Sequence, residues 1–117
     1  MSWNEALKKG QEIVMATCSK KGEPRAVVVI SLGLVDGKLL VGACQMKTAL
    51  KNLTENKKVS IVVKKDRRYF RINGDAAVYG EGKFLEAAIK RSNSPLPHHA
   101  IAIKIKEIFD LDKAKRI

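Results

Sequence analysis

The dipeptide Asp36-Gly37 is the feature that most constrains how this chain can fold. An Asp-Gly pair suits the positive φ angles of the tight turn that joins two antiparallel strands. A long apolar run, Arg25 to Val35, precedes the pair and Lys38 to Ala43 follows it, so we expect these segments to form a hairpin. Turn residues at Lys20 to Pro24 separate the run from the apolar segment Glu12 to Ser19. The sequence therefore predicts three antiparallel strands in succession.

Three further segments have the character of strands: Val59 to Val63, Tyr69 to Tyr79, and Ala100 to Lys106. The turn residues Asp66 to Arg68 separate the first two of these segments. Gly74 and Asp75 interrupt the second segment and predict a β-bulge or a sharp bend. The third segment alternates in its second half, which is typical of a strand with one exposed face.

Short helices are predicted at residues 2–9, 48–55 and 83–91, and two prolines make residues 92–99 an irregular loop. Hairpin-connected strands with so few helical residues favour a mainly β fold. We expect a six-stranded antiparallel barrel with two or three short flanking helices. The 117 residues show no repeat and no linker, so we expect a single domain spanning residues 1–117.

The composition is strongly basic, with 23 Lys and Arg against 12 Asp and Glu and a formal net charge of +11. Such an excess is compatible with nucleic acid, acidic membranes or phosphorylated small molecules as partners. The cations are dispersed and fall mostly at predicted turns, which favours an ordinary solvated surface. No apolar run is long enough to span a bilayer, and the N-terminus lacks a signal-peptide pattern. We therefore expect a cytoplasmic protein that does not associate with membranes.

The segment from Gly42 to Leu53 predicts a buried strand that runs directly into a short helix. Thr48 is the expected N-cap, and Lys47 and Lys51 lie four residues apart on one helix face. The first amides of a helix have no internal partners and carry partial positive charge, so this arrangement favours a phosphate group. The local sequence is equally compatible with a capped surface helix whose lysines are solvated.

Other chemical groups give weaker signals. His98 and His99 are adjacent, so their side chains should point to opposite faces of a strand and cannot easily hold one metal ion. Cys18 and Cys44 are expected to be buried free thiols. The segment Arg67 to Arg71 interleaves basic and aromatic residues, as nucleic-acid-binding surfaces do. We expect instead a hairpin tip whose aromatic residues turn inward. No hydrolytic set of catalytic residues stands out.

The order of these features resembles a known family, the FMN-binding split β-barrel proteins, often called pyridoxamine 5′-phosphate oxidase-like. The similarity covers nearly the whole chain and is greatest to the small bacterial FMN-binding proteins. Each motif is only moderately specific, but their order and spacing together carry the resemblance. The motifs are Ala16-Thr17-Cys18, the turn Lys20 to Arg25, Val27 to Ile30, Asp36 to Val41, Met46-Lys47-Thr48 with Lys51-Asn52-Leu53, Asn56 to Ile61, and Tyr69 to Ala76.

The resemblance implies a homodimer with FMN bound at the subunit interface. It also implies electron or hydride transfer through the flavin, with a small molecule as donor or acceptor. In the family the helix start binds the FMN phosphate, which falls here on Lys47 and Thr48, with Lys51 a weaker candidate. The flavin ring falls on Val28, Val29, Ile30 and Ser31, and the ribityl chain and ring edge fall on Ala43, Cys44, Gln45 and Met46.

Two departures from the family refine this expectation. Oxidases of vitamin B6 carry a C-terminal segment with Arg and His, whereas residues 110–117 contain no histidine, so we do not expect that activity. Some relatives surround the phosphate with arginines, where this chain offers lysines and a threonine. The resemblance also allows the loop Leu96 to His99 to reach the partner's flavin, and a deazaflavin to replace FMN. A passive FMN carrier and a basic nucleic-acid-binding barrel without cofactor are the remaining alternatives.

Overall fold

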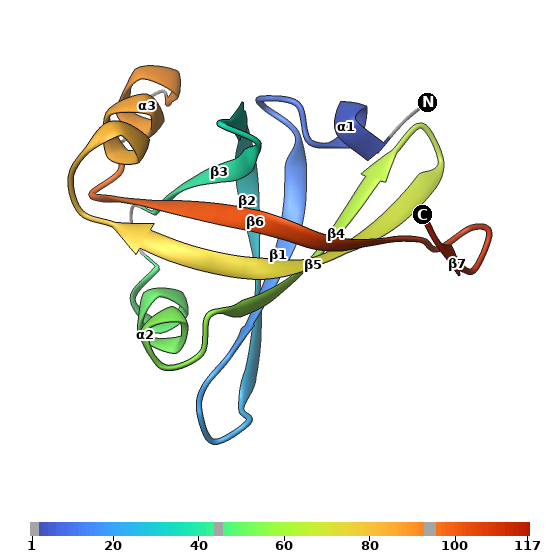
Figure 1. The fold of residues 1–117 in the computed structure, drawn as a ribbon, viewed down its shortest axis with the longest axis horizontal. Helices are drawn as coiled ribbons and strands as arrows, with labels where there is room; N and C mark the ends of the chain where they lie inside the picture. The colour runs from blue at the N-terminus through green and yellow to red at the C-terminus, as the bar shows by residue number, and fades with distance from the viewer. Residues whose placement is uncertain (1–2, 44–45, 93–95) are drawn as a thin grey trace.

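The computed structural model describes residues 3–43, 46–92 and 96–117. Its sheet has the strand order β3-β2-β1-β4-β5-β6-β7, and an additional pairing of β3 with β6 closes the first six strands into a barrel. All of these pairings are antiparallel (Figure 1). The predicted mainly β fold, a six-stranded barrel with short helices, is thereby confirmed. The elements are α1 (Trp3–Ala6), β1 (Glu12–Cys18), β2 (Pro24–Val35), β3 (Lys38–Ala43), α2 (Lys47–Glu55), β4 (Lys58–Lys65), β5 (Arg68–Tyr79), α3 (Lys83–Arg91), β6 (His99–Asp110) and β7 (Lys115–Arg116).

The turns form where the sequence predicts them. Asp36 and Gly37 have φ angles of 51° and 76°, so both residues of the β2–β3 turn lie in the left-handed region. Asp66 and Arg67, at 50° and 69°, form the β4–β5 turn in the same way without a glycine. These two turns fix the register of the hairpins on either side of the barrel.

Gly74 forms the irregularity predicted in β5. The register of β5 against β6 shifts between Asn73 and Gly74. At this point β6 passes so close that a Cβ atom on Gly74 would overlap the carbonyl oxygen of Lys104. Only glycine permits this close approach of two backbones, and the shift helps the long strand β5 to follow the curvature of the barrel.

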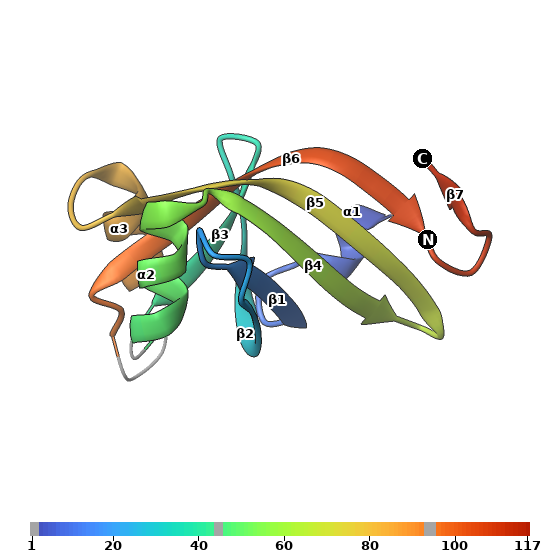
Figure 2. The ribbon, with the colours of Figure 1, turned by 90° about the horizontal axis from the view of Figure 1, so that it is seen from below.

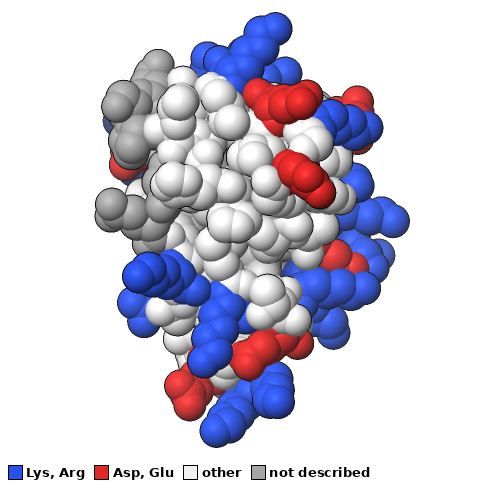
Figure 3. Space-filling model, turned by 90° about the vertical axis from the view of Figure 1, so that its left-hand side faces the viewer, with Lys and Arg blue, Asp and Glu red and all other residues white. Residues whose placement is uncertain are grey.

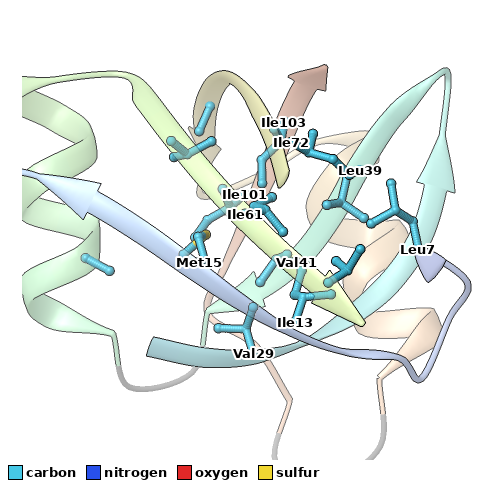
Figure 4. Packing of buried hydrophobic residues seen from close by; sticks show 14 of the residues in the cluster. Leu7, Ile13, Met15, Val29, Leu39, Val41, Ile61, Ile72, Ile101 and Ile103 are labelled. Carbon is cyan, nitrogen blue, oxygen red and sulfur yellow. The ribbon is translucent and has the colours of Figure 1, made fainter. Parts of the chain in front are cut away.

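The core lies inside the barrel and consists almost entirely of aliphatic side chains (Figure 4). Alternate residues of β1, β4 and β5 point inward, as the strand period of two requires. A second, smaller cluster packs α3 against β2, β3 and β6, with Phe84 and Ala88 as its helical members. Ten residues labelled in Figure 4 show the main core: Leu7, Ile13, Met15, Val29, Leu39, Val41, Ile61, Ile72, Ile101 and Ile103.

The observed elements differ from the prediction at several ends. Helix α1 ends at Ala6, before the predicted residue 9. Strand β6 continues to Asp110, and β7 pairs with its end, where the sequence analysis assigned neither. Figure 2 shows that α2 and α3 lie at one end of the molecule, opposite β7 and the β4–β5 turn. Within the described residues, no helix has the length and apolar character needed to cross a membrane.

Candidate functional site

A pocket of about 710 Å³ lies where β3 leads into α2. Three parts of the chain build it: the beginning of β2, the first turn of α2, and the residues that enter β6. Its volume falls within the range of about 300–1,000 Å³ that is typical of small-molecule sites. The lining residues are Arg25, Val27, Ala43, Met46, Lys47, Thr48, Ala49, Leu50, His98 and His99.

The pocket is electropositive. Arg25 and Lys47 both line it, and neither side chain makes a hydrogen bond or an ion pair with another described residue. No aspartate or glutamate belongs to its described lining. Two unneutralised cations around a partly enclosed space favour a ligand with negative charge. Figure 3, viewed toward the end with α2 and α3, shows Lys and Arg side chains, with several Asp and Glu among them, around a broad uncharged surface.

The start of α2 lacks a side-chain cap. Its N-cap residue is Met46, which offers no side-chain hydrogen bond to the first turn. The prediction that Thr48 is the N-cap is therefore wrong: the helix begins at Lys47, one residue earlier, so Thr48 lies within the first turn. This change leaves both the first amides of the helix and the Thr48 hydroxyl available to an anion at the pocket.

A buried polar contact fixes α2 against the barrel. Asn52 Nδ2 donates a hydrogen bond of 3.0 Å to Thr17 Oγ1, and both side chains are buried. Ala49 and Leu53 pack into the main core from the same helix face. Because a buried amide needs its partner, this contact holds α2 against β1 and so helps to position the helix start beside the pocket.

Both histidines line the pocket, although they are adjacent in the sequence. The His98 amide donates a 3.0 Å hydrogen bond to the Ala43 carbonyl oxygen, and His99 is paired with Ala43 in the β3–β6 ladder. The strand β6 begins only at His99, so the alternation of faces does not extend to His98. Among the described residues, no group of three metal-ligating side chains accompanies them.

The structure brings together only part of the predicted site. Ala43, Met46, Lys47 and Thr48 line the pocket, whereas Lys51 is exposed outside its lining. Cys44 and Gln45 lie outside the described residues.

The four residues expected along the flavin ring do not line this pocket. Val28 and Ile30 are exposed on the outer face of β2, and Val29 points into the core. Ser31 is buried, where its hydroxyl donates a hydrogen bond of 2.7 Å to the Leu7 carbonyl oxygen. Any contact of these residues with a flavin stays a prediction.

The sequence analysis did not assign four residues that line the pocket: Arg25, Val27, Ala49 and Leu50. The expectation that only lysines and a threonine surround the anion is corrected by Arg25, whose side chain lines the same pocket. Residues two apart in a strand share a face, so the side chains of Arg25 and Val27 belong together. The alternation along β2 was the available signal.

A row of valines lies on the outer surface of the barrel. Val28, Val14 and Val62 are register partners across β2, β1 and β4, and their side chains are 64%, 39% and 39% exposed. Ile30, also on β2, extends this apolar area with 46% exposure. An exposed apolar row across three strands is typical of a surface that another molecule covers.

The barrel closed by β3 and β6, with a basic pocket at the start of α2, defines a split-barrel protein with a site suited to an anion. A family profile described as pyridoxamine 5′-phosphate oxidase matches residues 3–112. The chain therefore belongs to the pyridoxamine 5′-phosphate oxidase family. A search among curated proteins gave no match.

Solved structures of low sequence identity share the fold. HupZ from Group A Streptococcus superimposes with a TM-score of 0.85 at 23% identity, covering 100% of this chain and 99% of that one. An FMN-binding protein from Syntrophomonas wolfei gives 0.74 at 18% identity, covering 92% and 80%. HutZ from Vibrio cholerae, described as a heme storage protein, gives 0.72 at 15% identity, covering 92% and 91%.

Proposed function

We propose that this protein is an FMN-binding flavoprotein that transfers electrons or hydride between the flavin and a small molecule. The observation that carries the proposal is the pocket in which Arg25, Lys47 and the uncapped start of α2 converge, with no carboxylate among the lining residues that the structure describes. Membership of the pyridoxamine 5′-phosphate oxidase family supports a phosphorylated flavin as the anion. The FMN-binding protein from Syntrophomonas wolfei, with the same fold, supports the same choice.

The residues present fit such a ligand. The guanidinium group of Arg25, the ammonium group of Lys47 and the first amides of α2 would hold the phosphate, with the Thr48 hydroxyl as a further donor. Val27, Ala43, Met46 and Leu50 supply apolar surface beside these polar groups. A few polar groups in a mainly apolar pocket can fix the orientation of a cofactor.

Bound FMN would supply the redox chemistry as an acceptor and donor of hydride or single electrons. The chain's own residues would bind and orient it and shield its apolar part from water. His98 and His99 reach the same pocket, where an imidazole nitrogen can donate or accept a hydrogen bond with a small molecule bound beside the flavin.

A homodimer belongs to the same proposal. The valine row on β2, β1 and β4, together with Ile30, offers an apolar surface of the kind that a second copy would cover. The family resemblance implies that FMN lies at the subunit interface. The outward position of Val28 and Ile30 is compatible with a ligand that lies between two subunits.

The test is an absorption spectrum of the purified full-length protein, followed by heat release and identification of the chromophore. We expect flavin bands and released FMN, or stoichiometric uptake of added FMN by colourless protein. A protein that neither contains nor takes up FMN would contradict the proposal. If FMN is bound, its reduction by NADH or NADPH would exclude a passive FMN carrier. Release of a deazaflavin would show that the cofactor is a deazaflavin and not FMN.

Heme is a second candidate ligand, favoured by one observation. Two histidines line a pocket that also contains Arg25 and Lys47, so imidazole could ligate iron while the cations pair with the propionates. HutZ, which shares the fold, is described as a heme storage protein. Titration with hemin and with FMN in parallel separates the candidates. Binding of hemin in place of FMN, lost in a His98→Ala/His99→Ala double variant, would favour heme.

A further inference from the structure

The end of the molecule opposite α2 and α3 carries a second unusual surface (Figures 1 and 2). Here β4, β5, β6 and β7 lie side by side, and their register brings outward-facing residues together. Lys64 pairs with Tyr69 across β4 and β5, while Arg71, Phe109 and Arg116 pair in a row across β5, β6 and β7. We call these five residues the basic–aromatic surface.

Cations lie over aromatic rings within this surface. The Arg71 guanidinium carbon is 4.8 Å from the centre of the Phe109 ring, and Lys64 Nζ is 5.5 Å from the centre of the Tyr69 ring. Tyr69 is 40% exposed, whereas its neighbour Phe70 is buried in the core. The expectation that the aromatic residues of this hairpin turn inward is therefore correct for Phe70 and wrong for Tyr69.

Two acidic residues nearby, Asp110 and Asp112, are already engaged by the protein itself, whereas Asp66 in the β4–β5 turn is exposed. The buried Asp110 carboxylate accepts a 2.6 Å hydrogen bond from Arg68 and further bonds from the amides of Asp112 and Lys113. Burial raises the pKa of Asp110, but these donors outweigh it and hold the pKa below its ordinary value of 3.8. The Asp112 carboxylate accepts the Tyr69 amide hydrogen at a distance of 2.8 Å.

The remaining cations of this end are therefore available to a ligand. Glu107 pairs with Arg116 at 3.4 Å, but Lys64 and Arg71 form no ion pair with any described residue. Four more basic side chains around the same turn and hairpin likewise form none within the described parts of the chain. They are Lys65, Arg67, Lys113 and Lys115.

We propose that the basic–aromatic surface binds single-stranded nucleic acid. Bases would stack on the exposed ring of Tyr69 and beside Phe109, while the unpaired cations contact the phosphates. A duplex is a poorer fit, because its bases are already stacked on one another and present no free face to an aromatic ring. The surface lies at the opposite end from the pocket, so the proposal does not depend on the proposed cofactor.

The experiment measures the fluorescence anisotropy of a labelled twelve-nucleotide oligo(U) as full-length protein is added, at several salt concentrations. We expect affinity to fall steeply with salt, with a log–log slope of about −0.7 for each phosphate contact. Tyr69→Ala should weaken binding about tenfold or more through lost stacking. Lys64→Gln/Arg71→Gln should weaken it and make the salt slope shallower by about one to one and a half.

A matched control carries the same change of net charge elsewhere. Lys20→Gln/Lys21→Gln removes two exposed cations from the turn between β1 and β2, and we expect its affinity to stay within about twofold of the wild type. An equal loss of affinity in the two double variants would show that binding depends only on net charge, and would overturn the proposal. Absence of binding at low salt would also overturn it. Thermal unfolding of each variant verifies that it folds.

Competition identifies the class of anion. Unlabelled oligo(U) should displace the labelled strand, whereas polyphosphate of equal charge and vesicles with anionic lipid should compete at least tenfold less well. Equal competition by polyphosphate would mean that the rings contribute nothing, and preferential binding of vesicles would assign the surface to membranes. Either result contradicts single-strand binding.

Discussion

Arg25 and Lys47 come from different elements, β2 and α2, and reach the same pocket, whose described lining contains no carboxylate. Both side chains are exposed, so water already screens their repulsion, and an anion bound between them would add the pairing that no described acidic residue supplies. A bound anion is the explanation that the proposed function gives for this arrangement. The uncapped amides at the start of α2 point to the same explanation, since helix starts usually have a side-chain acceptor.

Lys47→Ala should weaken FMN binding by about 1.5–3 kcal/mol, the range of a hydrogen bond to a charged group, which is about 10- to 100-fold in Kd. Arg25→Ala should have an effect of similar or larger size, because a guanidinium can donate two hydrogen bonds to one phosphate. Isothermal titration of the flavin-free protein with FMN measures both. Lys90→Ala, an exposed lysine on α3, removes one charge away from the pocket and should leave Kd unchanged. Unchanged affinity in both pocket variants would remove them from the site.

Individual residues of the candidate site could be predicted where the residue types of a short segment indicate an anion site. Lys47 and Thr48 were found because a strand that runs into a helix brings charged and hydroxyl side chains to the helix start. Arg25 was not assigned to the pocket, and His99 was considered only as part of a loop near the partner's flavin, because only closure of the barrel brings β2 and β6 beside α2. Local composition does not show which strands will lie side by side after the barrel closes.

Among the elements, β5 and β6 depend most on one position. Gly74 allows β6 to pass close enough that an added Cβ atom would overlap the Lys104 carbonyl oxygen and lie near Ile103 Cγ2. Neither neighbour can move easily, because one is backbone within a ladder and the other is fully buried. The glycine therefore serves close packing of two strands and not a positive φ angle.

Gly74→Ala should lower the free energy of unfolding by about 1–3 kcal/mol or more, the usual cost of overpacking, and should shift the register of β5 against β6. Chemical denaturation followed by tryptophan fluorescence at Trp3 and by circular dichroism measures the change. Gly80→Ala is the matched control: its Cβ atom would meet the His99 ring at 3.6 Å, an ordinary contact. Similar stability of the two variants would show that the strands can separate without cost.

Elements were predictable where the strand period and the turn residues agree. The turn at Asp36-Gly37 and the bulge at Gly74 follow from residues that tolerate unusual backbone geometry. The sequence analysis missed the end of β6 and the short β7. Residues 107–109 are partly buried and Asp110 is buried, so buried and exposed side chains do not alternate clearly at this end of β6. β7 pairs with the end of β6 in a short hairpin, and the Asp110 carboxylate accepts hydrogen bonds from the amides of its turn.

At the scale of the whole molecule, one row of outward-facing residues crosses neighbouring strands of the barrel. Its side chains are apolar on one half and mostly basic on the other. Val28, Val14 and Val62 form its apolar half, and Arg71, Phe109 and Arg116 form its basic half. Neither half is visible in any one segment of the sequence, because each strand contributes a single residue. The apolar half suits a second copy of the chain, whereas the basic half suits an anionic partner.

The apolar half predicts the assembly state. The wild-type chain of 12.9 kDa should elute at twice that mass in size-exclusion chromatography with light scattering. Val14→Lys places an ammonium group in the middle of the row, so association would require a charge to lose its hydration, and we expect a monomer. Ile89→Lys is a close control, because Ile89 on α3 has the same 39% exposure as Val14 but lies away from the row, and it should stay dimeric. A monomeric wild type, or equal dissociation of both variants, would contradict the assignment. If the dimer interface also holds the flavin, Val14→Lys should lose FMN together with its partner, whereas Ile89→Lys should retain both.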